Sequence, residues 1–338
     1  MSADVRGIVP TGAIRYNTDS NKMECFNGTK WMQIAVSSPD LGNSTNSDNP
    51  GGARGVYMGG DPGSGATDVI QYLTIPPVGN TIDFGNLTQS RRGLRCCGSR
   101  TRGLAMSGAG SSPRFDTIDF VTISQTGTCT DFGNLESIQA LSCASNQTRA
   151  FALGGDTPAI QNQMQYVTIA STGNMVDAGD LTAASAVGNT FGSPTRGFYS
   201  GLASPTNTKI DFFNFASTGN AQNFGDMPSA EGSGSGLSSA TRGIQVGGGT
   251  YSNSIYYVTM ATLGNGMDFG DLTAGKSMLA STSDSVRGVN ISGYISPGAN
   301  TNVIDYINIA TQGDAVDFGD QVTTARNGGA TSNAHGGL

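Results

Sequence analysis

The sequence predicts an all-β protein: a six-bladed β-propeller of four-stranded blades, closed by N- and C-terminal strand pairing and preceded by a small N-terminal β-meander. Three observations predict this fold. A unit of about 47 residues recurs six times, and this is close to the length of one four-stranded blade. Each unit repeats the same short runs rich in β-branched and aromatic residues. Fifty glycines and only 13% charged residues disfavour long amphipathic helices.

Each unit begins at an arginine that precedes a short apolar strand. Successive separations between these arginines are 48, 47, 47, 46 and 45 residues, and glycine follows in every unit except the third. The first strand ends at glycine, as in RGVYMGG at 54–60 and RGIQVGG at 242–248. The six anchors are Arg54, Arg102, Arg149, Arg196, Arg242 and Arg287.

The second run of each unit carries an aromatic residue at one fixed place. It reads VIQYLTI at 69–75 and TIDFVTI at 117–123, and such content over seven residues predicts a strand rather than a helix. The aromatic positions are Tyr72, Phe120, Tyr166, Phe212, Tyr257 and Tyr306.

A turn that often reads TGN leads into the third run, such as IDFGNL at 82–87 or MDFGDL at 267–272. We expect the Gly and Asn of the turn to accept positive φ angles. We expect the Phe of the third run to pack between blades, and its Gly to let another backbone pass close by. The fourth strand is predicted in the small-residue stretch before the next anchor.

The two ends of the repeat region predict ring closure. The segment before Arg54 lacks the small-residue strand that precedes the other five anchors, whereas the chain ends in ARNGGATSNAHGGL. His335 stands 48 residues after Arg287, in phase with the anchors. We therefore expect this tail, His335 included, to supply the missing strand of blade one, which removes an open sheet edge.

These features resemble kelch-type propellers over about residues 53–338: a short strand ending in Gly-Gly, a second strand with a central aromatic, and a turn before the third. The characteristic kelch Trp near the third strand is absent, since the single Trp is Trp31. The repeat is more similar to tailed-phage proteins that carry TRG, YVTIA, STGN and DFGDLT at this period. That resemblance implies a structural protein of a virion.

The N-terminal segment at 12–35 reads GAIRYNTDSNKMECFNGTKWMQIA and predicts three short strands, separated by 18–21 and by an Asn-Gly hairpin signal at 27–28. So small a meander needs a partner, which could be the propeller, another copy or a different subunit. The segment resembles a module of phage tail-fibre and other virion proteins, through Ile14, Arg15, Tyr16, Asn17 and Trp31. This resemblance implies that residues 1–36 serve attachment to other virion proteins or oligomerisation.

The stretch 37–52, SSPDLGNSTNSDNPGG, has no apolar pattern and predicts a linker. The predicted organisation is therefore a β-module at 1–36, a linker at 37–52 and the propeller at 53–338.

The anchor arginines are predicted to bridge strands or blades through a partly buried, bidentate contact. The acceptor is either a carboxylate beside the FG step, such as Asp131, or a backbone carbonyl. The alternative is an exposed polar ring, which would contribute little.

Charge and composition exclude several partners. The net charge is −7, the pI is near 4.6 and no run of Lys or Arg occurs, which argues against nucleic acid. No stretch of about 18 apolar residues predicts a membrane span. The N-terminus has no secretory pattern, so we expect assembly in a host cytoplasm and residence in the virion. The five cysteines lack CxxC spacing and a nearby histidine, which favours free thiols over a metal site. No cofactor is expected.

Catalysis has few groups available. The DFG triplets lack the Gly-rich and catalytic loops of kinases, and the sole histidine, His335, makes Ser/His/Asp or Cys/His catalysis improbable. We expect a non-enzymatic tail-fibre, capsid or tail protein whose loops bind host-surface glycan or a neighbouring virion protein. These loops vary most between repeats, at 61–68, 111–116, 156–163, 203–209, 250–254 and 295–302. A glycan depolymerase using two carboxylates, a cellular kelch-like adaptor and a homo-oligomer stay open.

Overall fold

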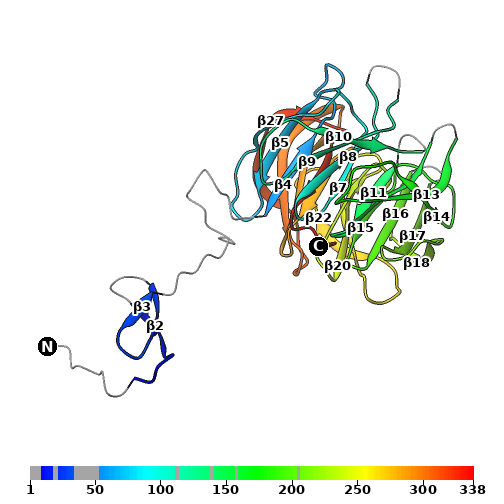
Figure 1. The fold of residues 1–338 in the computed structure, drawn as a ribbon. Helices are drawn as coiled ribbons and strands as arrows, with labels where there is room; N and C mark the ends of the chain where they lie inside the picture. The colour runs from blue at the N-terminus through cyan, green and yellow to red at the C-terminus, as the bar shows by residue number, and fades with distance from the viewer. Residues whose placement is uncertain are drawn as a thin grey trace. The chain divides into compact units, whose positions relative to one another are not determined.

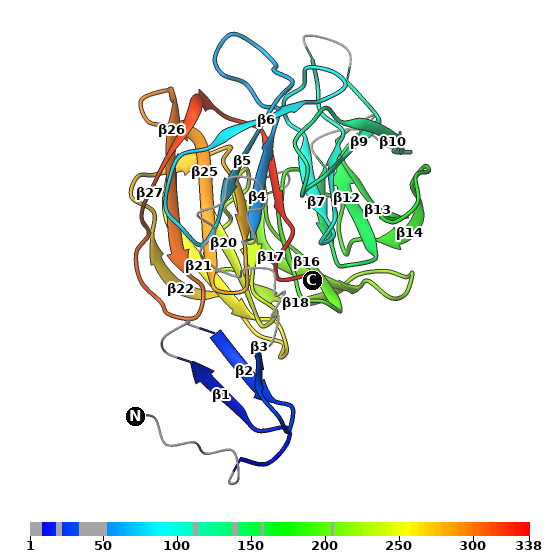
Figure 2. The same ribbon diagram turned by 60° about the vertical axis from the view of Figure 1, so that its left-hand side comes forward.

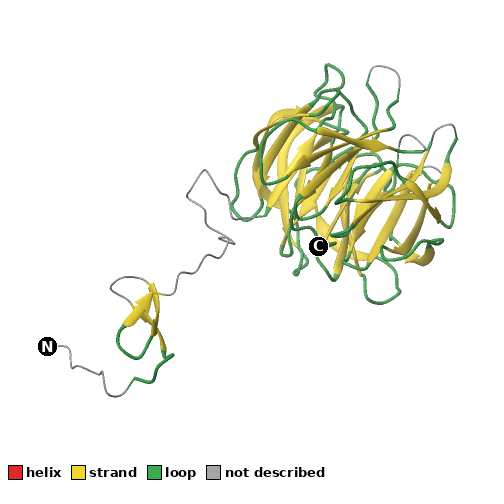
Figure 3. Ribbon diagram, viewed as in Figure 1, coloured by secondary structure: helices red, strands yellow, loops and turns green. Residues whose placement is uncertain are grey.

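The structure is a computed structural model that describes residues 9–17, 22–33, 53–110, 114–136, 141–156, 159–203 and 206–338. The chain divides into two compact units, Met1–Leu41 and Gly42–Leu338. Every regular element in the described residues is a β-strand, as Figures 1 and 3 show. The predicted linker at 37–52 and the turn at 18–21 lie outside the described residues.

The N-terminal unit contains a three-stranded antiparallel sheet. Its strands are β1 (Ile14–Asn17), β2 (Lys22–Phe26) and β3 (Trp31–Gln33), in that order across the sheet. The turn after β2 forms at the predicted Asn-Gly pair: the Asn27 side chain accepts hydrogen bonds from the Thr29 and Lys30 N–H groups, and Gly28 has a φ of 95°.

Residues 53–338, here called the repeat domain, form further antiparallel sheets in a propeller-like arrangement. Sheet 1 contains β28 (Gly329–Ser332), β4 (Arg54–Met58), β5 (Val69–Thr74) and β6 (Ile82–Asn86). Sheet 2 contains β7 (Arg95–Gly98), β8 (Arg102–Met106), β9 (Thr117–Thr122) and β10 (Thr130–Asn134). Sheet 3 contains β11 (Ser142–Ser145), β12 (Arg149–Gly155), β13 (Gln161–Thr168) and β14 (Val176–Asp180).

The later repeats give three more sheets of the same kind. Sheet 4 contains β15 (Asn189–Gly192), β16 (Arg196–Ala203), β17 (Thr206–Asn214) and β18 (Gln222–Asp226). Sheet 5 contains β19 (Ser235–Ser238), β20 (Arg242–Gly248), β21 (Ser252–Thr259) and β22 (Met267–Asp271). Sheet 6 contains β23 (Lys276–Ser277), β24 (Ala280–Ser283), β25 (Arg287–Ile295), β26 (Ala299–Asn308) and β27 (Val316–Ala325). Sheet 6 has a fifth strand because β23 and β24 both pair with β25, on either side of Met278, whose φ is 55°.

The two ends of the repeat domain meet in sheet 1. Strand β28 pairs antiparallel with β4, from Gly329 opposite Met58 to Ser332 opposite Gly55. The small-residue strand of sheet 1 therefore comes from the C-terminal end of the chain, whereas in the other sheets it directly precedes the anchor arginine. The expectation that His335 belongs to this strand was wrong, because β28 ends at Ser332 and His335 lies beyond it.

The third run of each repeat forms a bulged strand. In sheet 2, Asp131 pairs with Asp119 and Gly133 pairs with Ile118, so Phe132 is the additional residue. The same shift occurs at the corresponding step of the other five sheets. A bulge bends a strand and increases its twist, so the FG step shapes the outer strand of each sheet.

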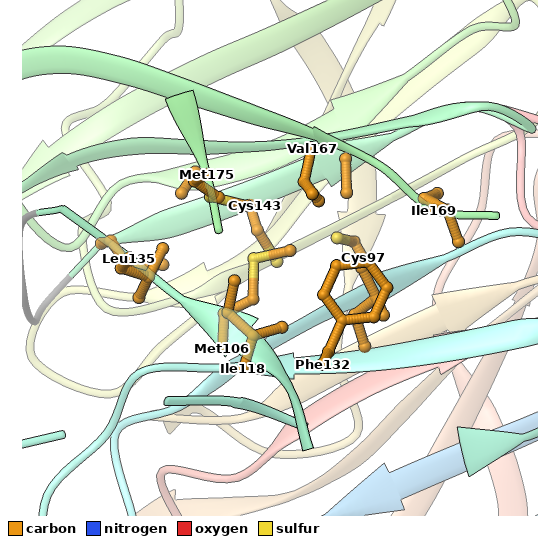
Figure 4. Packing of buried hydrophobic residues seen from close by; sticks show 13 residues of the cluster. Cys97, Met106, Ile118, Phe132, Leu135, Cys143, Val167, Ile169 and Met175 are labelled. Atoms are coloured by element: carbon orange, nitrogen blue, oxygen red, sulfur yellow. The ribbon is translucent and has the colours of Figure 1, made fainter. Parts of the chain in front are cut away.

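The core of the repeat domain lies between successive sheets. Buried apolar side chains of the described residues form clusters that each join two sheets, and one of them joins sheet 6 to sheet 1. Figure 4 shows the cluster between sheets 2 and 3, where Met106 and Phe132 of sheet 2 gather with Cys143, Val167 and Met175 of sheet 3. The Phe of the third run thus packs between sheets, as the sequence predicts.

The glycine of the FG step receives the backbone of the next sheet. A Cβ on Gly133, which has a φ of 147°, would lie 2.3 Å from the carbonyl oxygen of Gly173 in the turn before β14. That turn donates the Gly173 N–H to Phe132 O at 2.8 Å and the Met175 N–H to Asn134 O at 2.9 Å. The Asn174 side chain accepts the Asn134 N–H, so the turn Asn serves the neighbouring sheet.

The inner strands are connected by serine hydroxyls. Ser145 of β11 donates to Gly98 O of β7 at 2.7 Å and accepts the Gly98 N–H at 2.8 Å. Ser238, Ser283 and Ser332 donate in the same way to the last residue of the preceding inner strand. Small residues are needed here because these strands approach one another closely.

A set of left-handed residues, here called the collar, lies just before the inner strands. Its described members have φ angles between 55° and 70° and donate their N–H groups to one another's carbonyl oxygens at 2.7–3.0 Å. They are Gly93, Val187, Ser233, Met278 and Asn327. The equivalent position 140 lies outside the described residues. Four of the five are not glycine, so composition did not signal the collar.

Candidate ligand-binding face

The anchor arginines each connect two sheets through a carbonyl oxygen. Arg102 of β8 donates to Ile169 O of sheet 3 at 2.9 Å, and its guanidinium lies 4.7 Å from the ring centre of Phe120 in its own sheet. The other five anchors repeat both contacts, and Arg287 reaches Ile75 O of sheet 1 at 3.0 Å. The fixed aromatic of the second strand thus serves as a platform for the anchor.

Of the two acceptors that the sequence left open, the carbonyl is the one used, but the predicted bidentate geometry was wrong, because a single nitrogen, Nη1, makes the contact in every anchor. No anchor forms an ion pair with a carboxylate among the described residues. The acidic residues beside the FG step, such as Asp131 and Asp268, are exposed instead. Arg54 is buried and the other anchors are partly buried, so their role is to join sheets.

A second set of contacts between sheets was not predicted. The Thr88 hydroxyl and N–H, at the end of sheet 1, donate to the carboxylate of Asp119 in sheet 2 at 2.8 and 3.0 Å. Thr182 makes the same contacts to Asp211. Thr273 contacts Asp305 through its hydroxyl. We call these three contacts the Thr–Asp clasps.

Two of the clasps also hold a buried cation. Arg91 lies 2.6 Å from Asp119, and Lys276 lies 2.5 Å from Asp305, with both side chains of each pair at most 1% exposed. Asp211 has no cation within salt-bridge distance among the described residues, because Ser185 occupies the position of Arg91. Burial raises the pKa of Asp211, although the Thr182 hydrogen bonds oppose the rise.

The variable loops follow the anchor strands and lie at the opposite end of the sheets from the arginines. The connections from β4 to β5 and from β25 to β26 stand at the same end in Figure 2. The Asn300 amide of β26 donates to Asp61 O in the loop after β4 at 2.8 Å, and Arg114 pairs with Asp156 of the next sheet at 2.6 Å. Residues 111–113, 157–158 and 204–205 of these loops lie outside the described residues.

Asp61 organises one sector of this loop face. Its carboxylate is nearly fully buried and accepts from Arg92 at 2.6 Å, Arg326 at 3.3 Å and the Gly63 N–H at 2.8 Å. Burial alone would raise the pKa of Asp61, but these hydrogen bonds together lower it. The carboxylate is therefore ionised and fixes two guanidinium groups, which leaves the sector with a net positive charge.

Two tyrosines complete this sector, which we call the Tyr–Arg cluster. Tyr251 lies in the loop between β20 and β21 of sheet 5, and Tyr294 lies near the end of β25 in sheet 6. Their ring centres are 5.8 Å apart, and the Arg326 guanidinium lies 4.4 Å from the Tyr294 ring centre. Both rings are partly exposed, and Tyr251 has a φ of 61°, which is unusual for a residue with a side chain. Tyr and Arg are the residues that most often dominate binding surfaces.

One face of the N-terminal sheet combines an ion pair with the packed rings of Phe26 and Trp31, and the other face is apolar. Arg15 pairs with Glu24 at 2.8 Å and lies 4.2 Å from the Trp31 ring centre, and the amide of Asn17 donates to Glu24. These hydrogen bonds, from Asn17 first and then Arg15, lower the pKa of Glu24. Ile14 and Tyr16 point to the other face, where they are 61% and 57% exposed. The predicted module residues therefore divide between the two faces.

The apolar face continues across all three strands. Ile14 pairs with Cys25 and Cys25 with Met32, while Tyr16 pairs with Met23, and paired residues share a face. Met23 and Met32 are 40% and 46% exposed. No charged side chain of the described strands takes part in this face, which suits it to contact another apolar surface.

The sole histidine has a structural place. The His335 ring Nε2 lies 2.9 Å from Gly98 O, and Nδ1 accepts the Gly337 N–H at 3.2 Å. Burial lowers the pKa of His335 to about 4, so the ring is neutral at pH 7 and donates from Nε2. The C-terminal residues thereby lie against the inner strands at the anchor end of the sheets.

Comparison with known proteins gives no match, either to a family model or to a curated protein. The described residues include no helix long and apolar enough to cross a membrane. No group of three or more His, Cys, Asp or Glu side chains that could hold a metal occurs in the described part of the chain.

Proposed function

We propose that residues 53–338 form a closed six-bladed β-propeller, and that the protein is a non-enzymatic virion component whose propeller loops bind glycan on the host surface. The N-terminal module then attaches the propeller to other virion proteins. The Tyr–Arg cluster is the observation that carries the binding function.

Three contacts support ring closure. Strand β28 completes sheet 1, Phe318 of sheet 6 packs in one cluster with Leu73 of sheet 1, and Arg287 of sheet 6 donates to Ile75 O of sheet 1. The packing and the arginine contact between sheets 6 and 1 have counterparts at the other junctions. Closure leaves no open edge that could recruit another strand.

The Tyr–Arg cluster supports glycan as the ligand. Tyr251 and Tyr294 offer flat apolar surfaces for the C–H faces of a sugar ring, and Arg92 and Arg326 offer donors for its hydroxyl or carboxylate oxygens. The net charge of the sector favours a sugar that carries a carboxylate. Asp61 keeps the two guanidinium groups in place before the ligand arrives, which reduces the entropic cost of binding.

The virion assignment rests on the resemblance of the repeat and of the N-terminal module to tailed-phage proteins. The exposed apolar face of Ile14, Tyr16, Met23 and Met32 supports attachment, because a sheet this small is not stable with one face uncovered.

Binding of the purified protein to a panel of host-surface polysaccharides tests the function. We expect Tyr251→Ala and Tyr294→Ala to lower affinity at least tenfold, whereas Leu263→Ala, at a side chain 66% exposed on a different turn, leaves affinity unchanged. Equal binding by all three variants would contradict the assigned face. Cleavage of the polysaccharide would mean that the protein is a depolymerase rather than a non-enzymatic binding protein.

Mass spectrometry of purified particles from the phage that encodes the chain tests the virion assignment separately. The protein should be present at a fixed ratio to the structural subunits. Its recovery from uninfected cells, and its absence from particles, would favour a cellular adaptor.

A further inference from the structure

A cavity of about 90 Å³ lies between the inner strands of the repeat domain. The cavity is lined by all of the inner strands, β7, β11, β15, β19, β24 and β28. The residues next to the collar lie at one end of the cavity, and His335 lies at the other end. We call this cavity the chamber. Its volume exceeds what a single water molecule needs.

Arg95 brings the only formal charge to the chamber wall in the described part of the chain. It is the one Lys, Arg, Asp or Glu among the described lining residues. The equivalent residue in the other inner strands is short: Ser142, Asn189, Ser235, Ala280 and Gly329. Because these five residues are short, they leave space between the inner strands for the Arg95 side chain.

The Arg95 charge has no counter-ion in the described residues. One of its five N–H groups donates to Leu94 O at 3.2 Å, and the other four have no acceptor among the described residues. The titratable groups that act on it are Cys143, Cys96, Tyr199 and Tyr57. Burial raises the pKa of both tyrosines to about 12 and that of both thiols above its usual range, so all four are neutral at pH 7.

Arg95 is partly exposed, and its guanidinium cannot lose its proton near neutral pH, so a positive charge without a counter-ion among the described residues stays at the chamber wall. The chamber therefore combines an unpaired guanidinium with room for several atoms.

We propose that the chamber is a binding site for a small oxyanion, a carboxylate or inorganic phosphate, held by the Arg95 guanidinium. Such an anion accepts two parallel N–H bonds from the Arg95 guanidinium. It neutralises the charge between the inner strands and so stabilises the repeat domain. This site is independent of the loop face, and its test does not depend on glycan binding.

Thermal unfolding of the full chain in acetate or inorganic phosphate tests the proposal, with chloride holding the ionic strength constant because it lacks the paired oxygens of a carboxylate or phosphate. We expect the Tm of the wild type to rise by about 2–4 °C for each tenfold increase in anion above its Kd. The arm that responds, acetate or phosphate, identifies the anion. A Tm that is flat in both arms would overturn the proposal.

Two variants make the test specific. Arg95→Ser places at this position the residue that β11 and β19 carry, so it should fold, and its Tm should not respond to either anion. Arg95→Lys keeps the positive charge but lacks the parallel N–H groups of a guanidinium, so its Tm should rise less with anion concentration than that of the wild type. An equal response in Arg95→Ser would place the anion elsewhere. Should Arg95→Ser not fold, anomalous diffraction from wild-type crystals soaked in selenate must show a peak at Arg95.

Discussion

The buried pair of Arg91 and Asp119 should be one of the most costly positions to disrupt. Both side chains are fully buried, and Arg91 also donates to Ser107 O at 3.1 Å and Thr117 O at 2.9 Å. Arg91→Ser introduces the residue that sheet 4 carries at this place, and leaves the carboxylate with only its Thr88 hydrogen bonds. We expect a loss of about 3–5 kcal/mol in the free energy of unfolding, because the remaining charge is buried and unpaired.

Urea unfolding of Arg91→Ser, Asp119→Asn and the double variant measures this loss. Asp119→Asn leaves a buried guanidinium, so it should also cost about 3–5 kcal/mol, whereas the double variant removes both charges and should cost at least about 2 kcal/mol less than the sum. Simple additivity, or single losses below about 1 kcal/mol, would refute the reasoning.

The pH dependence gives a second check on the same variant. In Arg91→Ser, Asp119 resembles Asp211, whose pKa is raised by burial. A carboxyl group with a raised folded pKa destabilises the fold above its unfolded pKa, and protonation relieves this as the pH falls. The difference between the wild type and Arg91→Ser should therefore shrink between pH 7 and pH 4.

Three further outcomes follow from single positions. Gly133→Ala places a Cβ 2.3 Å from Gly173 O at a φ of 147° and should cost about 2 kcal/mol or more in urea unfolding, whereas Gly173→Ala meets no atom within 4 Å and should cost little. The folded pKa of His335 is about 4, below its unfolded value of 6.5, so the stability that the neutral ring contributes is complete above pH 6.5 and is lost as the pH falls to about 4. For this partly exposed ring the loss amounts to about 2 kcal/mol in the free energy of unfolding. This dependence on pH should be missing in His335→Gln. A thiol reagent should leave Cys97, Cys129 and Cys143 unmodified in the folded protein, because all three are buried between sheets, and should modify all five cysteines after unfolding.

The strand pattern of the repeat domain was predictable because it is local. The composition of single runs is enough to predict strands, as in the run with the central aromatic Tyr166 or the runs that end in Gly-Gly. The absence of a small-residue strand before Arg54 indicated where β28 had to pair. The acceptor of the anchor arginines was not predictable in the same way. A backbone carbonyl such as Ile169 O is present at every residue, so nothing in the sequence distinguishes the one that Arg102 reaches.

The collar and the Tyr–Arg cluster were missed for different reasons. Val187 and Met278 have left-handed backbone conformations although neither is glycine, so the sequence does not indicate these conformations. They form only where the inner strands come close together. Tyr251 and Arg326 lie outside the strands and Tyr294 lies near the end of β25, in segments whose sequences do not repeat, so only the assembled sheets bring them together.

The Thr–Asp clasps, by contrast, left a readable signal across junctions. Where Thr88, Thr182 or Thr273 ends one sheet, the next sheet carries an Asp. The other junctions replace both partners, with Glu, Pro or Val facing Gln or Tyr: Glu136 and Gln165, Pro228 and Tyr256, Val322 and Gln71. The pairs become visible when the position of Thr88 in each unit is compared with the position of Asp119 in the next unit.

The same comparison predicts that equivalent substitutions in two clasps differ in cost. Thr182→Val removes the hydroxyl that Asp211 accepts at 2.7 Å, and no cation among the described residues compensates there, so we expect a loss of about 2–3 kcal/mol. Thr88→Val removes the same bond from Asp119, where Arg91 still neutralises the carboxylate, and should cost about 1 kcal/mol. Urea unfolding of both variants measures the difference. Equal losses would mean that the cation contributes nothing to the clasp, since valine and threonine have nearly the same shape.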